Sequence, residues 1–329
     1  MKTPKTNARP SKGLAKQIIS TAIILATALL LLYYLTTHIS DFKQLFSLSI
    51  GSLWLIVILV LILLFNFLIT GMLNNELMKP FGVSLKPKEY FGLSIVTNFY
   101  NYITPFRGGM IARAAYLKKK HNFAIVNFLA TLSAVYVLVF LIASLLGLIS
   151  MLFIKISYNL FNLPVFILFL GIFLFMFLII ILSPKIPESK NKWLNRFIKV
   201  INGWHLIKNN KRVIFIVSII TLIQLALGAI SSILTYRIIG LDLSFSKALF
   251  LSAIGNLSIL VSITPGNLGV GDAIAVFSAS LIGITLTQAV AATILGRAIG
   301  LITIFILGPI FSYILLKHKP EPKSKPKDI

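Results

Sequence analysis

Long apolar runs dominate the chain, and short polar segments rich in lysine and arginine separate them. Each run reaches or exceeds the ~20 residues with which a helix crosses ~30 Å of hydrocarbon. Six runs are predicted to be membrane-spanning helices, at residues 17–35, 50–78, 123–154, 164–183, 213–239 and 287–316. Because no small-x-small cleavage site follows the first run, we expect an uncleaved anchor helix there rather than a signal peptide.

Two further apolar stretches, at about 89–120 and 246–286, are interrupted near their middles by a Thr-Pro dipeptide followed by glycines. The interruptions are Thr104-Pro105 and Thr264-Pro265. Proline and glycine break helices, so each stretch is predicted to enter the membrane as a re-entrant hairpin and return to its side of entry. The chain is therefore predicted to be an all-α polytopic integral membrane protein.

A repeat with an offset of 158 residues relates the two broken stretches. Pairs at this offset are Gly82 with Gly240, Ser94 with Ser252, and Asn98 with Asn256. Each half of the chain, 17–154 and 164–316, then holds three spans and one hairpin. Because an odd number of spans separates the copies, we expect an inverted repeat, with the two hairpin tips approaching each other near the middle of the membrane.

Charge sets the expected orientation of the spans. The net charge is +23, although only 12% of residues are charged and 57% are apolar. Lysines and arginines number five in 1–16, three in 79–88, five in 107–120, eight in 184–212 and five in 317–329. All of these fall on one side if the N-terminus is cytoplasmic, whereas the other side holds Lys43, Lys155, Arg237 and Lys247. The positive-inside rule predicts a multi-pass protein of the cell membrane with both termini in the cytoplasm.

The segments outside the spans are short. The basic N-terminal segment 1–16 is expected in the cytoplasm, the loop 155–163 outside, and the tail 317–329 disordered in the cytoplasm. Within the central connection, Trp193, Phe197 and Trp204 recur at helical spacing. They predict an amphipathic interfacial helix at about 190–206, which either anchors the linker or gathers lipid.

Recognisable catalytic motifs are missing from the sequence. It has no cysteine, no Gly-rich phosphate loop with lysine, no G-x-S-x-G and no paired carboxylates, and its four histidines lie near predicted span ends. We therefore expect neither an enzyme nor a bound cofactor or metal. The basic loops fit an anionic membrane surface, so no nucleic-acid partner is expected either.

The first hairpin carries a candidate anion site. Thr104 and Pro105 have the form of an N-cap followed by the first helical position, so a helix starting at Pro105 would turn its positive end toward the tip. Arg107 lies in that first turn and Arg113 lies six residues later. Free amides and guanidinium groups suit a phosphate, although both arginines could instead be ordinary charges that reach the membrane surface.

The second hairpin is rich in glycine. Its candidate binding residues are Thr264, Pro265, Gly266, Asn267 and Gly269. Glycines permit close approach of a ligand to the backbone, or equally close packing of helices. Asp272 follows, and its candidate partner is Arg297 in the last span. Asp272 is either the counter-ion of a structural pair or a proton- or cation-coupling residue.

These motifs resemble those of the lysylphosphatidylglycerol synthase transmembrane (flippase-like) family. Residues 105–117 resemble its first signature, residues 265–272 its second, and Arg297 falls where its last span carries an arginine. The sequence departs from the pattern at Met110 and Asp272, where the family usually has glutamate, and the span 123–154 lacks the family's Glu-Arg pair. The resemblance implies lipid translocation, or a supporting role in lipid-linked glycan or aminoacyl-lipid pathways, without lysine transfer.

The favoured hypothesis is a lipid translocase that moves a lipid with an anionic or glycosylated head group between leaflets. Both hairpin tips would form its site, with Arg107, Arg113 and Arg297 binding phosphate. The alternatives are a non-transporting partner of a glycosyltransferase or lipid-modifying enzyme, and an ion-coupled carrier of small solutes.

Overall fold

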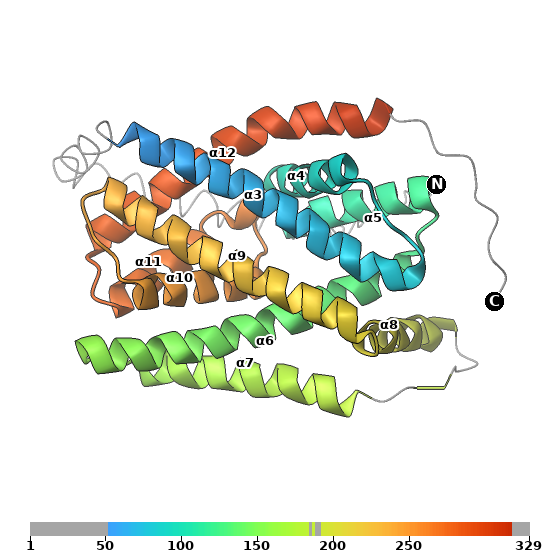
Figure 1. Cartoon of the computed structure of the whole chain (residues 1–329), viewed down its shortest axis with the longest axis horizontal. Coiled ribbons are helices and arrows are strands. Elements are labelled where there is room, and N and C mark those ends of the chain that lie inside the picture. The colour runs from blue at the N-terminus through green and yellow to red at the C-terminus, as the bar shows by residue number, and fades with distance from the viewer. Residues whose placement is uncertain (1–51, 184–185, 188–191, 318–329) are drawn as a thin grey trace, which may run out of the picture.

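A computed structural model describes residues 52–183, 186–187 and 192–317, and in these residues every regular element is a helix. The long helices lie side by side along the long axis of the molecule (Figure 1). The predicted first span at 17–35 and the basic segment 1–16 lie outside the described residues, as does the tail beyond residue 317.

Five helices are long and apolar enough to cross a membrane by length and composition. They are α3 (Leu53–Met78), α6 (Ile125–Tyr158), α7 (Leu163–Leu182), α9 (Lys211–Ile238) and α12 (Leu286–Lys317). These helices coincide with five of the six predicted spans, so the prediction of a multi-pass, all-helical membrane protein is confirmed for this part of the chain.

Each Thr-Pro interruption lies in a turn between two shorter helices. Helix α4 (Pro87–Ile103) leads through the 3-10 turn η2 (Pro105–Arg107) into α5 (Gly108–His121), and α4 packs against α5. Helix α10 (Phe245–Leu257) leads through η3 (Ser258–Val261) and η4 (Pro265–Asn267) into α11 (Val270–Leu281). A further turn, η1 (Lys79–Phe81), ends α3.

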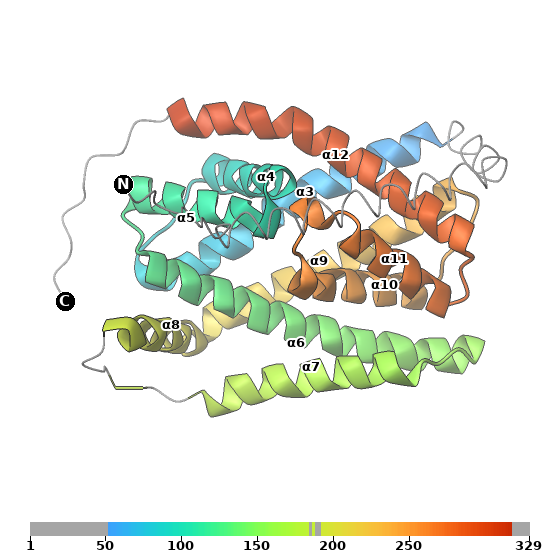
Figure 2. The same ribbon diagram turned by 180° about the vertical axis from the view of Figure 1, so that it is seen from behind.

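The two helix pairs approach the middle of the molecule from opposite ends of its long axis, as both views show (Figures 1 and 2). Their tips are in contact, because η2 packs against η4 and the Phe106 N–H donates to the Ile263 carbonyl oxygen at 3.4 Å. How deeply the tips lie in a membrane stays a prediction.

The two tips also share their backbone conformation. Each proline is followed by two residues in the left-handed region: Phe106 (φ 53°) and Arg107 (φ 56°) in one, Gly266 (φ 58°) and Asn267 (φ 56°) in the other. Non-glycine residues rarely adopt positive φ, so its recurrence at corresponding positions is a specific similarity. Both segments thus turn in the same way after the proline.

Packing of α3 and α9 joins the two halves of the chain. These helices run antiparallel side by side (Figure 1), while α6 packs against α10 and α7, and α12 packs against α4. The largest buried cluster contains Phe140, Phe169 and Phe250 from α6, α7 and α10. Phe169 is the one buried residue of α7, so most of α7 presents apolar side chains outward, as expected of a helix that faces lipid.

Helix α8 (Lys192–Lys208) covers most of the predicted interfacial segment. Trp204 is buried and its indole N–H donates to the Ser183 hydroxyl at 3.1 Å, and Ile207 is also buried. Both pack with residues of α3, α6 and α9, so the C-terminal half of α8 is anchored to the bundle. Its placement at a membrane surface stays a prediction.

Candidate functional site

A cavity of about 480 Å³, called the central cavity below, is lined by residues of α3, α4, α5, α6, α9, α10 and α12 and of the turns η2 and η3. Much of its lining is polar, although the surrounding helices are mostly apolar. The polar side chains are Asn66, Thr70, Asn74, Ser94, Thr97, Asn98, Asn101, Tyr102, Arg107, Arg113, Tyr136, Gln224 and Asn256. Buried polar groups are costly unless they are hydrogen-bonded, so this polar lining among apolar helices indicates a hydrated or ligand-binding space.

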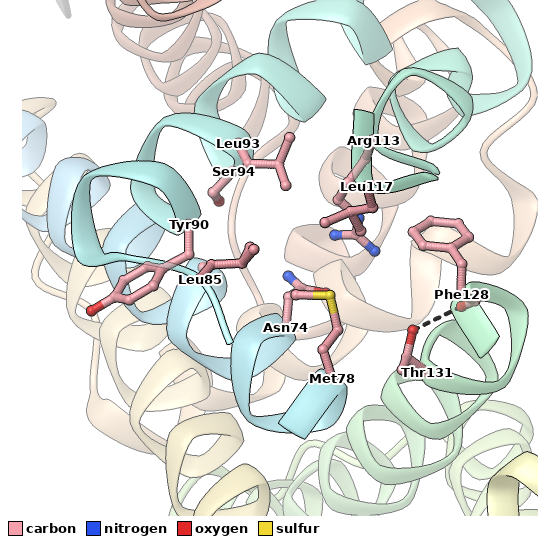
Figure 3. Close-up of a pocket in the computed structure, with 11 residues that line it drawn as sticks. Asn74, Met78, Leu85, Tyr90, Leu93, Ser94, Arg113, Leu117, Phe128 and Thr131 are labelled. Atoms are coloured by element: carbon pink, nitrogen blue, oxygen red, sulfur yellow. Dashed lines mark hydrogen bonds between the residues drawn. The ribbon is translucent and has the colours of Figure 1, made fainter. Parts of the chain in front are cut away.

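Arg113 on α5 is the most deeply buried charge in this cavity. Only 6% of its surface is exposed, and its guanidinium carbon lies 5.1 Å from the centre of the Phe128 ring. Among the described residues it has no carboxylate partner and no hydrogen bond. Figure 3 shows its guanidinium pointing into a small adjoining pocket, towards Asn74 and between Ser94 and Phe128. A buried arginine normally has a counter-ion, so this one is available to an anion.

Ser94 adds a second unpartnered group. Its side chain is buried and its hydroxyl has no hydrogen-bond partner, although it lines both the cavity and the pocket around Arg113. Leaving a buried hydroxyl unsatisfied costs roughly 1–3 kcal/mol. A ligand or water that binds beside Arg113 would remove that cost.

Arg107 reaches the same cavity from the tip of the first hairpin. Its Nη1 donates to the Tyr136 hydroxyl at 3.0 Å, and its guanidinium lies 5.9 Å from the Tyr136 ring centre. Tyr136 on α6 is itself stacked on Phe140. This contact orients Arg107 without neutralising its charge, so further donors of the guanidinium group stay available.

Every carboxylate in the described part of the chain is engaged elsewhere by a cation. The pairs are Glu76 with Lys79, Glu89 with Lys120 and His121, Asp242 with Arg237, and Asp272 with Arg297. None of these four acids lines the central cavity. The cavity therefore holds two guanidinium groups with no opposite charge among the described residues.

Arg297 on α12 is placed differently, because its donors are used within the protein. Its Nε donates to Asp272 at 2.6 Å and its Nη1 to the Gly266 carbonyl oxygen at 2.8 Å. Further bonds go to the Asn267 carbonyl oxygen at 3.1 Å and the Tyr102 hydroxyl at 3.2 Å. Arg297 thus ties the second tip to α12 and to the first hairpin.

Asp272 also fixes the start of α11. Its second carboxylate oxygen accepts from the Gly269 N–H at 2.9 Å, so Asp272 satisfies the backbone amide at the N-terminus of this helix. Gly269 itself has φ 80°, a conformation that favours glycine. Asp272 was expected to be either a structural counter-ion or a coupling residue. Its contacts with Arg297 and with the Gly269 N–H are those of a structural counter-ion.

A second cavity, of about 390 Å³, lies on the other side of Tyr102 and Gly296, which line both cavities. Asp272, Arg297 and Asn267 line this second cavity, together with a set of hydroxyls: Ser231, Ser232, Thr235, Tyr236, Ser258, Ser278 and Thr293. Its two charges are paired with each other. The hairpin tips and Tyr102 therefore stand between a positively charged cavity and a neutral one.

The expected capping role of Thr104 was wrong. Its hydroxyl donates to the Tyr100 carbonyl oxygen and so closes the end of α4, and α5 begins at Gly108 rather than at Pro105. The positive φ angles of Phe106 and Arg107 are the physical reason, because they turn the chain away before α5 starts. Thr264 is buried, and its hydroxyl donates to the carbonyl oxygen of Leu268, four residues later, at 2.6 Å.

The predicted site residues therefore separate into two groups. Arg107 and Arg113 share one cavity. Asn267, Asp272 and Arg297 line the other, beside a tip formed by Thr264, Pro265, Gly266 and Gly269. Asn98 and Asn256 each donate a side-chain hydrogen bond to the backbone carbonyl oxygen of a serine four residues earlier. Both residues also line the first cavity.

Sequence reasoning missed six polar residues of the first cavity: Asn66, Thr70, Asn74, Thr97, Tyr136 and Gln224. Three of them are amides inside apolar spans. An amide in a predicted membrane helix is a usable signal, because it needs a polar partner or a hydrated space.

The helices and cavities define a multi-pass membrane protein with polar space enclosed among its spans. The chain belongs to the family described as the lysylphosphatidylglycerol synthase TM region, whose model matches residues 17–308. The resemblance carried by the two hairpin signatures is thereby confirmed. No curated protein and no solved structure matches the chain.

Proposed function

We propose that this protein is a membrane lipid translocase that moves a lipid with a phosphate-bearing head group between leaflets. The observation that carries the proposal is the central cavity with Arg107 and Arg113 and no carboxylate among the described residues. Guanidinium groups bind phosphate through charge-assisted, often bidentate hydrogen bonds. The membership of the family supports a membrane function of this kind.

The proposal includes an inverted repeat of three spans and one re-entrant hairpin in each half. Its support is the antiparallel course of α3 and α9, the approach of the hairpins from opposite ends, and the shared backbone of their tips. Carriers built in this way hold their substrate between the repeats and open alternately to each side. The two cavities on either side of Tyr102 fit such an arrangement.

In the proposed mechanism Arg113 anchors the phosphate and Arg107 completes the site from the hairpin tip. Arg297 binds no lipid in this mechanism, because its donors hold the second tip. The proposed opening step is a movement of the Tyr102 side chain that breaks its bond to Arg297, joins the two cavities and leaves Asp272 paired. The protein then acts as a carrier rather than an enzyme.

Lipid exchange in reconstituted vesicles tests the proposal. The full chain is placed in phosphatidylcholine vesicles with fluorescent phosphatidylglycerol, and the probe accessible from outside is quenched over time. Arg107→Ala and Arg113→Ala are each expected to lower the exchange rate at least about tenfold, since each removes a charged hydrogen bond. Arg113→Lys should restore part of the rate, because a point charge replaces a planar fork.

Arg237→Ala is the matched control, because Arg237 forms an exposed pair with Asp242 outside both cavities. It should exchange lipid at the wild-type rate. All variants are compared by gel filtration and thermal unfolding to establish that they fold. Exchange at the wild-type rate by the folded double variant Arg107→Ala/Arg113→Ala would overturn the proposal.

A further inference from the structure

We infer that the central cavity selects head groups of net negative charge and rejects aminoacylated, cationic ones. This inference rests on the proposed function, which it narrows to one class of substrate. Lysyl-phosphatidylglycerol, the lipid named in the description of the family, is a suitable lipid for comparison, since a lysyl ester adds two ammonium groups to phosphatidylglycerol at neutral pH.

The first step is the charge of the cavity. A lysylated lipid carries a phosphate and two ammonium groups, and carboxylates are the side chains that would neutralise the ammonium groups. The described cavity offers only Arg107 and Arg113, and all four described carboxylates are occupied outside it. An ammonium group in this space would face two like charges in a medium of low dielectric constant.

Met110 is an uncharged residue of the cavity lining that lies between the two arginines in the sequence. It lines the cavity and lies three residues before Arg113 on α5, so the two side chains are neighbours on one helix face. It also lies three residues after Arg107, at the start of the same segment. Because the Met110 side chain is uncharged, it does not balance the positive charge of either arginine.

The uncharged part of the lining suits hydroxyl groups. Asn74, Asn98, Asn101 and Asn256 each make one hydrogen bond within the protein and keep further donors or acceptors. With the free hydroxyl of Ser94, they can bind the hydroxyls of glycerol or a sugar. The class of substrate that fits is an anionic lipid whose head group carries neutral hydroxyls.

The test compares two lipids that differ only by the lysyl ester. Phosphatidylglycerol and lysyl-phosphatidylglycerol, each fluorescently labelled on an acyl chain, are measured separately with the full chain in phosphatidylcholine vesicles. We expect lysyl-phosphatidylglycerol to exchange at least about tenfold more slowly, because its ammonium groups would be repelled by Arg107 and Arg113. Equal rates would overturn the inference and leave the proposed function standing, whereas exchange of neither lipid would overturn both.

A change at Met110 supplies the reverse test. Met110→Glu places a carboxylate beside Arg113 and should reduce the preference for phosphatidylglycerol by about tenfold. Met110→Gln has nearly the same shape without the charge and should keep the wild-type preference. An unchanged preference in folded Met110→Glu would overturn the inference. If that variant does not fold, the comparison of the two lipids with the wild-type chain still decides the question.

Discussion

Gln224 on α9 donates from its Nε2 to Oδ1 of Asn66 on α3 at 3.4 Å, and the two residues lie 158 positions apart. The same offset relates Gly82 to Gly240, which both end their helical segments with a positive φ. In an inverted repeat, equivalent residues touch each other only close to the axis that relates the copies. In the proposed inverted repeat, the Asn66–Gln224 contact would lie on this axis, and both residues line the central cavity.

The contact between the hairpin tips leads to a first prediction. Because the Phe106 N–H bonds to the Ile263 carbonyl oxygen, the α-carbons of these residues lie close enough for a disulfide to form after modest adjustment. The chain has no native cysteine, so cross-linking of an introduced cysteine pair is not disturbed by other thiols. Oxidation of Phe106→Cys/Ile263→Cys should produce an internal cross-link, seen as a mobility shift that a reductant reverses.

The control pair joins Phe106→Cys to Ser157→Cys, because Ser157 is exposed and lies about 30 Å along α6 from Tyr136, the residue of α6 that accepts from Arg107 of η2. It should stay reduced under the same conditions. Cross-linking of both pairs, or of neither, would contradict the described contact between η2 and η4.

The membrane architecture was largely predictable from the sequence. Five predicted spans coincide with helices because an apolar run of sufficient length has no other stable arrangement in hydrocarbon. The positions of the two breaks followed from Thr104-Pro105 and Thr264-Pro265. The conformation of the breaks did not follow, because the left-handed turn at Phe106 depends on packing between the tips rather than on local propensity.

The candidate site was predictable in part. Arginine in an apolar setting singled out Arg107, Arg113 and Arg297, yet their partners depend on which helices meet. Arg297 turns out to be enclosed by Asp272 and two carbonyl oxygens, whereas Arg113 has no such partners. Tyr102 separates one polar region into two cavities. This separation depends on how the helices pack and could not be predicted from the local sequence.

Orientation in the membrane gives a second prediction. The segregation of lysine and arginine predicts that the loop 155–163 lies outside and the connection before α9 in the cytoplasm. Ser157→Cys and Asn209→Cys both introduce a thiol at an exposed position. In intact cells, an impermeant maleimide should label Ser157→Cys and label Asn209→Cys only after permeabilisation. Labelling in the opposite order would reverse the proposed orientation.

A third prediction concerns the open end of the first hairpin, outside the five spans. Glu89 accepts from the Tyr116 hydroxyl at 2.7 Å and faces His121 Nε2 at 2.6 Å and Lys120 Nζ at 3.0 Å. Burial raises the pKa of Glu89, but the hydrogen bonds from His121, Tyr116 and Lys120 together outweigh it and lower the pKa to about 2. The folded protein therefore favours the ionised carboxylate.

Because the folded pKa lies below the ordinary value of 4.5, this group stabilises the fold above that pH and loses its contribution as the pH falls towards 2. Glu89→Gln should lower the free energy of unfolding at pH 7 by about 2 kcal/mol and weaken its dependence on acid pH. Thermal melts in detergent measure both effects. Asp242→Asn, in an exposed pair, should leave the melt nearly unchanged.

The last prediction concerns the packing of the second tip against Tyr102. A β-carbon added to Gly266 would lie 2.2 Å from the Tyr102 ring, and the φ of 58° at this position is itself unfavourable for alanine. Gly266→Ala must therefore displace either the ring or the tip, and with it the carbonyl oxygen that accepts from Arg297. We expect a destabilisation of about 1–3 kcal/mol and loss of lipid exchange.

Gly171→Ala on α7 is the matched control, because nothing lies within 4 Å of an added β-carbon there. Alanine has the higher helix propensity, so this variant should exchange lipid normally and unfold at the same temperature or slightly above. If Gly266→Ala also behaved like the wild-type chain, Tyr102 and the second tip would not be packed as described. The wall between the two cavities would then have to be formed by other residues.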